Sequence, residues 1–446
     1  MSIFKDCDIR GIYGTEINEE SVYRIGRGLA TMLPPGGEIR VGGDVRLSTP
    51  NLKENLIAGL VKGGARVTDL GIIPTPALYY ALASASADAG ATVTASHNPP
   101  EYNGIKFMFG HEPATRRTID TLEDIVVRGA FVEGAGSVSR LDILPAYLAS
   151  LSKRFGAKKP LKVVVDAGNG AMSTVAPAAF RNAGYRVTEL FCEPDGAFPN
   201  RDPNPAEHSH LGALRQKVVE VQADLGVAFD GDGDRAAFVD EKGRCLHNEK
   251  ALILFVQKLL AEHPTPVVFD QKSSSAVRDA VLSMGGAPIA EKSGHAFIKK
   301  RFLELGAAVA GEASGHFFFG NLGYDDGLYA ALLMAEILCA SDKTLSALAD
   351  EIFLPPITPD LRFFCPYEKQ DEMLRQFESY CESLNAKILK LDGVRAEFPD
   401  GWMLLRKSVT AEQMTLRIEA QTEFLLSERL NAVRKAIPEI QIEKGK

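Results

Sequence analysis

The first three quarters of the chain repeat one order of expected elements three times. Each copy has an apolar strand that ends in an aspartate, then a helix-like segment, a glycine and a second strand. A strand, a helix and a further strand form the crossover unit of a parallel-type sheet, so each copy predicts one α/β domain. The strand-ending acids lie about 100 to 120 residues apart, which is the spacing of domains rather than of a solenoid repeat. They are Asp44, Asp166 and Asp270.

The last quarter of the chain does not repeat this order. A proline-rich connector, 354–359, leads to a segment with a strand at 361–364, a helix at 371–384, four further strands and a final helix at 423–436. This α+β pattern predicts a smaller fourth domain, and 446 residues are enough for four domains. The predicted domain limits are 1–145, 146–247, 248–355 and 356–446.

Charge and composition exclude several classes of function. A net charge of −8 argues against general nucleic-acid binding, and it means that an anionic substrate needs a local cluster of Lys and Arg. No apolar run approaches the length of a membrane span, and the first residues do not resemble a signal peptide. The six cysteines are scattered without a CxxC pair, which favours free thiols in the cytoplasm. We therefore expect no nucleic-acid or membrane partner.

A polar loop follows the short apolar run 91–93. Two prolines forbid an immediate helix there, so Ser96 should lie in a rigid loop at the carboxyl edge of a strand, where α/β sheets bind ligands. The same loop carries His97, Asn103 and Lys106. Considered alone, Ser96 fits a helix-capping serine in a polar turn better than a nucleophile. The motifs further along the chain change this balance.

An acidic loop joins two expected strands, 225–229 and 236–239. It carries Asp230, Asp232 and Asp234 at alternating positions, with glycines between them that let the three carboxylates converge. Hard oxygen ligands of this kind suit Mg²⁺. A solvated acidic turn is one alternative. The other is a calcium loop of the EF-hand type with Glu241 at its twelfth position, but Arg235 stands where that loop needs glycine, and the flanks are strands.

Further polar loops supply groups that can bind hydroxyls and anions. A carboxylate beside a hydroxyl, as in Glu312 and Ser314, can hold neighbouring sugar hydroxyls. The fourth domain has two cations and two hydroxyls in sequence, a pattern that suits a phosphate. For each group taken singly, a surface or capping role is an equally good or better interpretation. The groups are Arg10, Lys272, His295, Lys299, Glu312, Ser314, His316, Arg406, Lys407, Ser408 and Thr410.

Three motifs together resemble the α-D-phosphohexomutase family, and within it the bacterial phosphomannomutase/phosphoglucomutase branch. They are Thr94-Ala95-Ser96-His97-Asn98-Pro99 with Asn103-Gly104-x-Lys106, then Asp230-Gly-Asp232-Gly-Asp234-Arg235, and Gly311-Glu312-x-Ser314-Gly315-His316. The resemblance covers essentially the whole chain. It implies three related α/β/α domains with mixed sheets and a smaller α+β domain, arranged around a central cleft.

The resemblance also implies a reaction and a set of site residues. Phosphorylated Ser96 would transfer its phosphoryl group to a hexose phosphate, giving a hexose 1,6-bisphosphate that turns around and returns the other phosphate. Its phosphate would complete a Mg²⁺ site with Asp230, Asp232 and Asp234, and the fourth domain would close over the substrate. The residues expected to line the centre are Arg10, His97, Lys106, Arg235, Lys272, His295 and His316, with Lys106 and His316 as possible proton shuttles. The expected protein is a monomer or weak homodimer that acts on a small phosphosugar.

The identity of the sugar stays open at this point. The Glu312 loop of relatives grips the 3- and 4-hydroxyls, which glucose and mannose share, so activity on both sugars is expected. Ala313 matches neither the Gln of phosphoglucosamine mutases nor the Met of phosphomannomutase/phosphoglucomutases. A phosphoglucosamine mutase, a sugar-phosphate phosphatase and a non-catalytic sugar-phosphate sensor are the alternatives.

Overall fold

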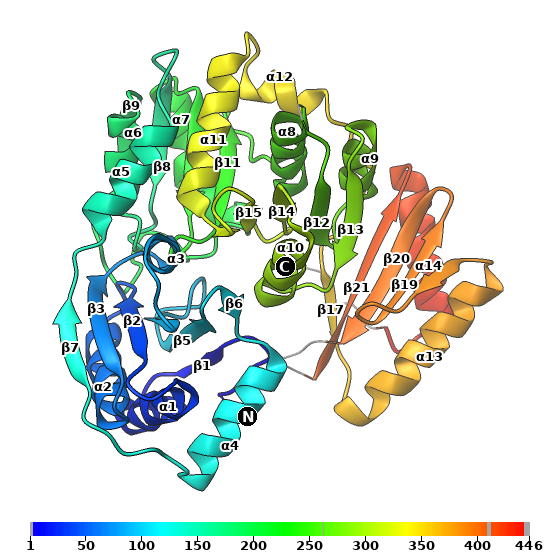
Figure 1. The fold of residues 1–446 in the computed structure, drawn as a ribbon. Helices are drawn as coiled ribbons and strands as arrows, with labels where there is room; N and C mark the ends of the chain where they lie inside the picture. The colour runs from blue at the N-terminus through cyan, green and yellow to red at the C-terminus, as the bar shows by residue number, and fades with distance from the viewer. Residues whose placement is uncertain (1–2, 262, 408–411, 441–446) are drawn as a thin grey trace.

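The structure, a computed structural model, describes residues 3–261, 263–407 and 412–440. Four units, each built on one sheet, follow one another along the chain, from the blue unit at the lower left of Figure 1 to the orange and red unit at the right. The first three sheets are mixed and carry helices, and the fourth is antiparallel, so the predicted fold class is confirmed. None of the helices in these residue ranges combines the length and the apolar composition that a membrane crossing requires.

The first three sheets share one topology. A central strand (β2, β8 or β12) pairs in parallel with the strand that follows its helix and, on its other side, with a third strand. This third strand (β4, β10 or β14) then pairs with an antiparallel return strand. The strands are β1 (Ile9–Ile12), β2 (Glu38–Gly43), β3 (Arg66–Ile72), β4 (Ala89–Val93), β5 (Tyr102–Phe109), β6 (Glu112–Pro113), β7 (Ser137–Arg140), β8 (Lys162–Asp166), β9 (Arg186–Leu190), β10 (Leu225–Phe229), β11 (Ala236–Asp240), β12 (Pro266–Asp270), β13 (Ala287–Glu291), β14 (Val309–Gly311), β15 (Phe317–Phe319) and β16 (Tyr324–Asp325).

This shared topology places the three functional loops at equivalent positions. Each loop joins the third parallel strand to the antiparallel return strand: the Ser96 loop between β4 and β5, the acidic loop between β10 and β11, and the Glu312 loop between β14 and β15. The carboxyl ends of parallel strands are where open α/β sheets bind ligands. Three equivalent loops therefore converge on one region.

The helices that the sequence predicts lie close to observed helices. The helix-like segment expected after Asp44 is α2, which begins at Thr49 because Pro50 suits the first turn. The helix expected from about 371 begins at Tyr367. The helices are α1 (Glu19–Met32), α2 (Thr49–Lys62), α3 (Thr75–Ser84), α4 (Arg116–Arg128), α5 (Leu144–Arg154), α6 (Val175–Asn182), α7 (Gly212–Glu220), α8 (Asn248–Leu260), α9 (Ser275–Ser283), α10 (His295–Leu305), α11 (Gly327–Ala340), α12 (Leu345–Asp350), α13 (Tyr367–Ser383) and α14 (Glu423–Ala436).

One helix joins the second and third units. Helix α11 is apolar on nearly every side and is buried along most of its length, as expected for a helix in the interior. It packs against β10 and β11 of the second sheet and against α8, although it follows the third sheet in the chain. A single apolar core therefore runs from α3 of the first unit through the second and third units.

The fourth unit has its own core. Its sheet has the order β17-β21-β20-β19-β18, and α13 and α14 pack against it. Its buried apolar side chains form a cluster separate from that of the other units. The strands are β17 (Leu361–Phe364), β18 (Lys387–Leu389), β19 (Val394–Phe398), β20 (Gly401–Lys407) and β21 (Gln413–Ala420).

Candidate active site

Ser96 lies where the first and second units meet. It is buried, and its Oγ lies 2.9 Å from Asp230 Oδ2 and 3.2 Å from His97 Nδ1. Ser96 has φ 51°, a left-handed conformation that costs a residue with a Cβ about 1 kcal/mol or more. Gly231 closes the contact, because a Cβ at this position would lie 2.4 Å from the Ser96 carbonyl oxygen. The fold thus places the buried hydroxyl of Ser96, a residue with a strained backbone, against the acidic loop.

The three aspartates of the acidic loop converge. Asp230, Asp232 and Asp234 are fully buried, and one oxygen from each lies within 4.8 Å of the others. Lys106 Nζ lies 2.8 Å from Asp232 Oδ2 and 2.6 Å from Asp234 Oδ2, and the Thr75 hydroxyl donates to Asp232 at 2.7 Å. Within the described residues, Asp232 Oδ1 and Asp234 Oδ1 have no hydrogen-bond partner. Hard oxygen donors with free lone pairs fit a divalent cation.

The electrostatics of the acidic loop also favour a bound divalent cation. Burial, and then repulsion from Asp232 and Asp234, raises the pKa of Asp230 to about 8. Burial opposes the charge of Asp232 as well, but the ammonium of Lys106 outweighs it and lowers the pKa of this carboxyl. The neighbouring cations do not fully compensate the three buried carboxylates, which still repel one another. A divalent cation among them would relieve this repulsion.

The EF-hand alternative does not fit this geometry. Strands flank the acidic loop, whereas helices flank an EF-hand loop. Glu241 also turns away, because its carboxylate accepts hydrogen bonds from the backbone N–H and the hydroxyl of Ser346.

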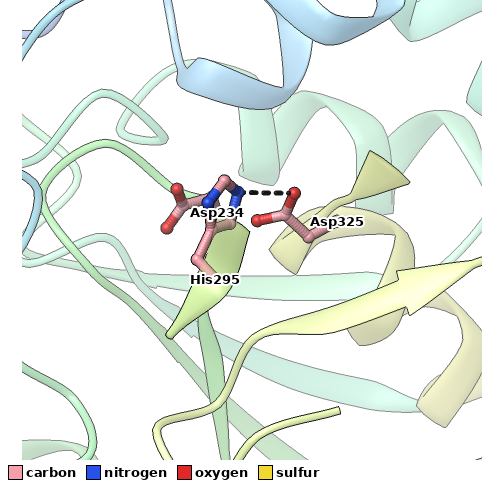
Figure 2. Close-up of side chains that lie close together, drawn as sticks. All are labelled: Asp234, His295 and Asp325. Carbon is pink, nitrogen blue, oxygen red and sulfur yellow. Dashed lines mark hydrogen bonds and ion pairs between the residues drawn. The ribbon is translucent and has the colours of Figure 1, made fainter. Parts of the chain in front are cut away.

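Two histidines share one buried carboxylate beside the acidic loop. Asp325 lies 3.0 Å from His316 Nδ1 and 3.2 Å from His295 Nε2. Figure 2 shows the His295 ring between the carboxylates of Asp234 and Asp325. Burial raises the pKa of Asp325, but the charge and hydrogen bonds of the two histidines outweigh burial and lower it well below its ordinary value. Asp325 therefore stays ionised and fixes the orientation of both rings.

Two of the three side chains in a second possible metal-binding group are already paired with each other. The ligand atoms of Asp234, His295 and Asp325 lie within 4.8 Å of one another, as the oxygens of the three aspartates do. However, His295 and Asp325 are bound to each other, whereas Asp232 Oδ1 and Asp234 Oδ1 in the acidic loop have no hydrogen-bond partner among the described residues. The acidic loop is the better candidate metal site.

His316 also contacts the second unit. Arg235 Nε donates to His316 Nε2 at 2.9 Å. Burial lowers the pKa of His316, but Asp234 and the hydrogen bond to Asp325 raise it more, and the net shift is upward. Both ring nitrogens of His316 thus have a defined partner.

A cavity of about 660 Å³ opens in front of these groups. Residues from all four units line it, with Arg235 from the second unit and Arg362 from the fourth. The predicted residues that line the cavity are Arg10, Ser96, His97, Lys106, Arg235, His295, Lys299 and His316. The lining is rich in cations, although the whole chain carries a net charge of −8. A dianionic ligand therefore has local positive charge available.

The other predicted residues that the structure describes lie outside this lining. Ser314 Oγ donates to Glu312 Oε2 at 2.8 Å, and the buried Glu312 Oε1 has no partner among the described residues. Lys272 Nζ lies 3.1 Å from Asp360, at the contact between the third and fourth units.

In the fourth unit, Arg406 Nε lies 3.3 Å from Asp392. Ser408 and Thr410 are outside the described residues.

Sequence reasoning missed several residues of the site. Asp325 contacts the predicted residue His316 from nine residues further along the chain, and Thr75 contacts Asp232 across 157 residues. Tyr79 lines the cavity, its hydroxyl lies 3.4 Å from His295 Nε2, and the buried Lys299 ammonium lies 3.8 Å from the centre of its ring. Asp325-Asp326 before an apolar helix was a possible signal, since it resembles a helix cap, but nothing local links it to His316.

Comparison with known proteins agrees with the fold and the site. The family models for the phosphoglucomutase/phosphomannomutase α/β/α domains I, II and III match residues 1–133, 145–243 and 247–354. A phosphomannomutase/phosphoglucomutase of Pseudomonas aeruginosa is 38% identical over 441 residues, which cover 97% of this chain and 94% of the relative. A phosphoglucomutase of Neisseria gonorrhoeae is 39% identical over 446 residues, which cover 98% and 96%. The crystal structure of a phosphoglucomutase/phosphomannomutase family protein from Burkholderia thailandensis superposes with a TM-score of 0.93 at 33% identity and covers 99% of each chain.

Three α/β/α units and a buried serine beside converging carboxylates define an enzyme of the intramolecular phosphotransferase class. Matches of this identity extend over nearly the full length of the chain. The chain belongs to the phosphoglucomutase/phosphomannomutase family.

Proposed function

We propose that this chain interconverts hexose 1-phosphates and hexose 6-phosphates of glucose and mannose, through phosphorylated Ser96 and a hexose 1,6-bisphosphate. The observation that carries the proposal is the 2.9 Å contact between Ser96 Oγ and Asp230, at a cavity with a cationic lining. Positioning and charge compensation dominate the catalysis of phosphoryl transfer, and both are available at this contact.

We infer that Mg²⁺ is the metal. Asp230, Asp232 and Asp234 would hold it together with an oxygen of Ser96 or of its phosphate, and two of their oxygens, Asp232 Oδ1 and Asp234 Oδ1, have no hydrogen-bond partner among the described residues. When bound, the ion would neutralise charge on the phosphoryl group during transfer. Thr75 and Lys106 contact the carboxylates from outside and orient them.

The proton of the attacking sugar hydroxyl needs an acceptor. As the sugar oxygen bonds to phosphorus, the bond between phosphorus and Ser96 Oγ breaks. The sugar hydroxyl loses its proton, and Ser96 Oγ leaves with the electron pair and is then protonated to the hydroxyl. We assign this proton to His316 Nε2, which would exchange its hydrogen bond from Arg235 for the sugar hydroxyl, because Asp325 holds the Nδ1 side of the ring and stabilises the charged imidazolium. Lys106, the other candidate, is bonded to two carboxylates and is better suited to remain an ammonium ion.

Residues of the third and fourth units would hold the sugar and the phosphate that is not being transferred. Glu312 has one free carboxylate oxygen for a sugar hydroxyl, and Ser314 lies beside it. Lys272 and Arg406, with Ser408 and Thr410, would hold the phosphate that is not transferred. A phosphate grip on a separate unit can serve both orientations of the bisphosphate and helps to exclude water, which would otherwise hydrolyse phosphoserine.

The wider setting is part of the same proposal. The domains would run from 1–145, 146–247, 248–355 and 356–446, in a monomer or weak homodimer. All six cysteines are free, which suits the cytoplasm that we propose as the location.

One assay tests the proposal. The protein is incubated with Mg²⁺, a trace of hexose 1,6-bisphosphate and the 1-phosphate of glucose, mannose or glucosamine. We expect the 6-phosphates of glucose and mannose, and no turnover by Ser96→Ala. Preferential turnover of glucosamine phosphate would identify a phosphoglucosamine mutase. Release of inorganic phosphate would identify a phosphatase, and the absence of any product would identify a sensor.

A further inference from the structure

A buried ion pair lies directly behind the Ser96 loop. Asp44 and Arg46, just after β2, have fully buried side chains, and Arg46 Nε donates to Asp44 Oδ2 at 3.1 Å. None of the proposed catalytic roles uses either residue. A buried pair is expensive to desolvate, so it persists only where further hydrogen bonds satisfy both groups.

The other N–H groups of the Arg46 guanidinium all donate hydrogen bonds to one loop. Its two terminal nitrogens donate to four backbone carbonyl oxygens between residues 96 and 102, at 2.6 to 3.0 Å. With the bond to Asp44, all five N–H donors of the guanidinium are used. The carbonyls belong to Ser96, Asn98, Pro99 and Tyr102.

The same pair holds Ser96 from both sides. Arg46 binds its carbonyl oxygen at 2.9 Å, and the Thr94 hydroxyl accepts from its backbone N–H at 2.9 Å. Thr94 in turn donates to Asp44 at 2.7 Å. Because the left-handed backbone of Ser96 is unfavourable for a residue with a Cβ, it persists only where the surroundings fix it.

Arg46 also touches the second unit, which carries Asp230. Its guanidinium lies 5.0 Å from the centre of the Phe198 ring, a cation–π contact. The backbones pack tightly here, since a Cβ on Gly196 would lie 2.3 Å from the Val45 carbonyl oxygen. One side chain therefore contacts both the loop of the hydroxyl and the unit of its carboxylate partner.

We propose that Arg46 is a positioning residue for phosphoryl transfer, fixing the loop 96–102 so that the Ser96 hydroxyl faces Asp230 across the boundary between the units. The inference rests on the proposed function. It concerns how the hydroxyl is aligned, and it assigns Arg46 no contact with the substrate.

Two variants and a matched control test this role. Arg46→Lys keeps a positive charge beside Asp44, but the three N–H donors of a lysine cannot replace the five hydrogen bonds of the Arg46 guanidinium. Phe198→Leu keeps Arg46 and removes only the ring. Arg40→Lys is the control, because Arg40 is also a buried arginine of the first unit, on β2, and it donates to the Ala81 carbonyl oxygen on α3.

Kinetics separate positioning from a general structural role. A misplacement of about 1 Å can cost about 100-fold in rate, so we expect kcat of folded Arg46→Lys to fall about 100-fold. KM should change less than about threefold, since the proposed sugar contacts lie in the third unit. Phe198→Leu should lose about tenfold in kcat, and Arg40→Lys less than twofold. The proposal would be overturned if kcat of both Arg46→Lys and Phe198→Leu stayed within threefold of kcat of Arg40→Lys. It would also be overturned if a rise in KM, rather than a fall in kcat, accounted for the loss of kcat/KM.

Hydrogen exchange gives a readout that does not need turnover. We expect amide exchange in residues 94–104 to accelerate at least tenfold in Arg46→Lys and to stay unchanged in Arg40→Lys. If Arg46→Lys yields no folded protein, Phe198→Leu is judged on the same exchange measurement, with faster exchange supporting and unchanged exchange overturning the proposal. If the wild-type protein shows no mutase activity, the proposed function fails, and exchange alone decides the role of Arg46 in the same way.

Discussion

The buried carboxyl of Asp326 makes the stability of the protein depend on pH. Asp326 is the N-cap of α11, and it accepts from the Tyr329 backbone N–H at 2.9 Å and from the Tyr147 hydroxyl at 2.8 Å. Neither partner carries a positive charge. Burial raises the pKa of Asp326 from 3.8 to about 7. The folded protein thus binds a proton that the unfolded chain has already lost near pH 6.

The sign and size of the effect follow from this shift. A carboxyl with a raised pKa stabilises the fold fully below its unfolded pKa, and this stability is lost as the pH rises through the folded pKa. Between pH 5 and pH 8.5 the loss for a shift of this size is about 3 kcal/mol. Asp326→Asn imitates the protonated carboxyl in shape and charge, so it should remove this pH dependence.

The measurement is urea unfolding of wild type and Asp326→Asn at pH 5, 6, 7 and 8.5. We expect the unfolding free energy of the wild type, relative to that of the variant, to fall by about 3 kcal/mol over this range. Infrared spectroscopy at pH 5 should show a protonated carboxyl band that the variant lacks. Parallel pH profiles of the two proteins would mean that Asp326 is ionised throughout, and the reasoning from burial would be refuted.

Three further predictions concern the acidic loop. Thr75→Val removes the hydroxyl that donates to Asp232, so Mg²⁺ affinity, measured by titration calorimetry, should fall about 10- to 100-fold, and an unchanged affinity would contradict this role. Gly231→Ala places a Cβ 2.4 Å from the Ser96 carbonyl oxygen and should lower kcat about 100-fold, whereas Gly156→Ala, where a Cβ meets nothing within 4 Å, should match wild type. Equal rates for these two variants would disprove the close contact. Removal of divalent ions with EDTA should abolish sugar phosphate interconversion and added Mg²⁺ should restore it, so full activity in EDTA would exclude a metal role.

Local sequence patterns predicted the three units because each pattern acts within a short segment. An apolar run ending in an acid marks the end of a buried strand, and the acids Asp44, Asp166 and Asp270 are all buried at such ends. The motifs around Ser96 and Asp230 were identifiable for the same reason, since the residue types and the glycines required for the turns are adjacent in the chain. Their shared position after the third parallel strand is visible only in the sheet topology.

The sequence did not indicate which distant side chains support these motifs. Arg46 reaches carbonyl groups 50 to 56 residues away, and backbone carbonyls leave no mark in a residue pattern. Asp325 serves two histidines from a short strand that looks like an ordinary helix cap. The sequence did not predict where helix α11 packs. It covers the second sheet because an apolar helix packs where the assembled units leave apolar surface.

The sequence by itself determined the three α/β units, the smaller fourth unit and the residue types that each loop carries. Only the tertiary structure decided that a hydroxyl from the first unit and a carboxylate 134 residues later would lie 2.9 Å apart. The physical reason is that strand and turn preferences act over a few residues, whereas the meeting of Ser96 and Asp230 depends on how whole units pack. That packing is set by a shared core and by buried contacts such as Arg46 against Phe198.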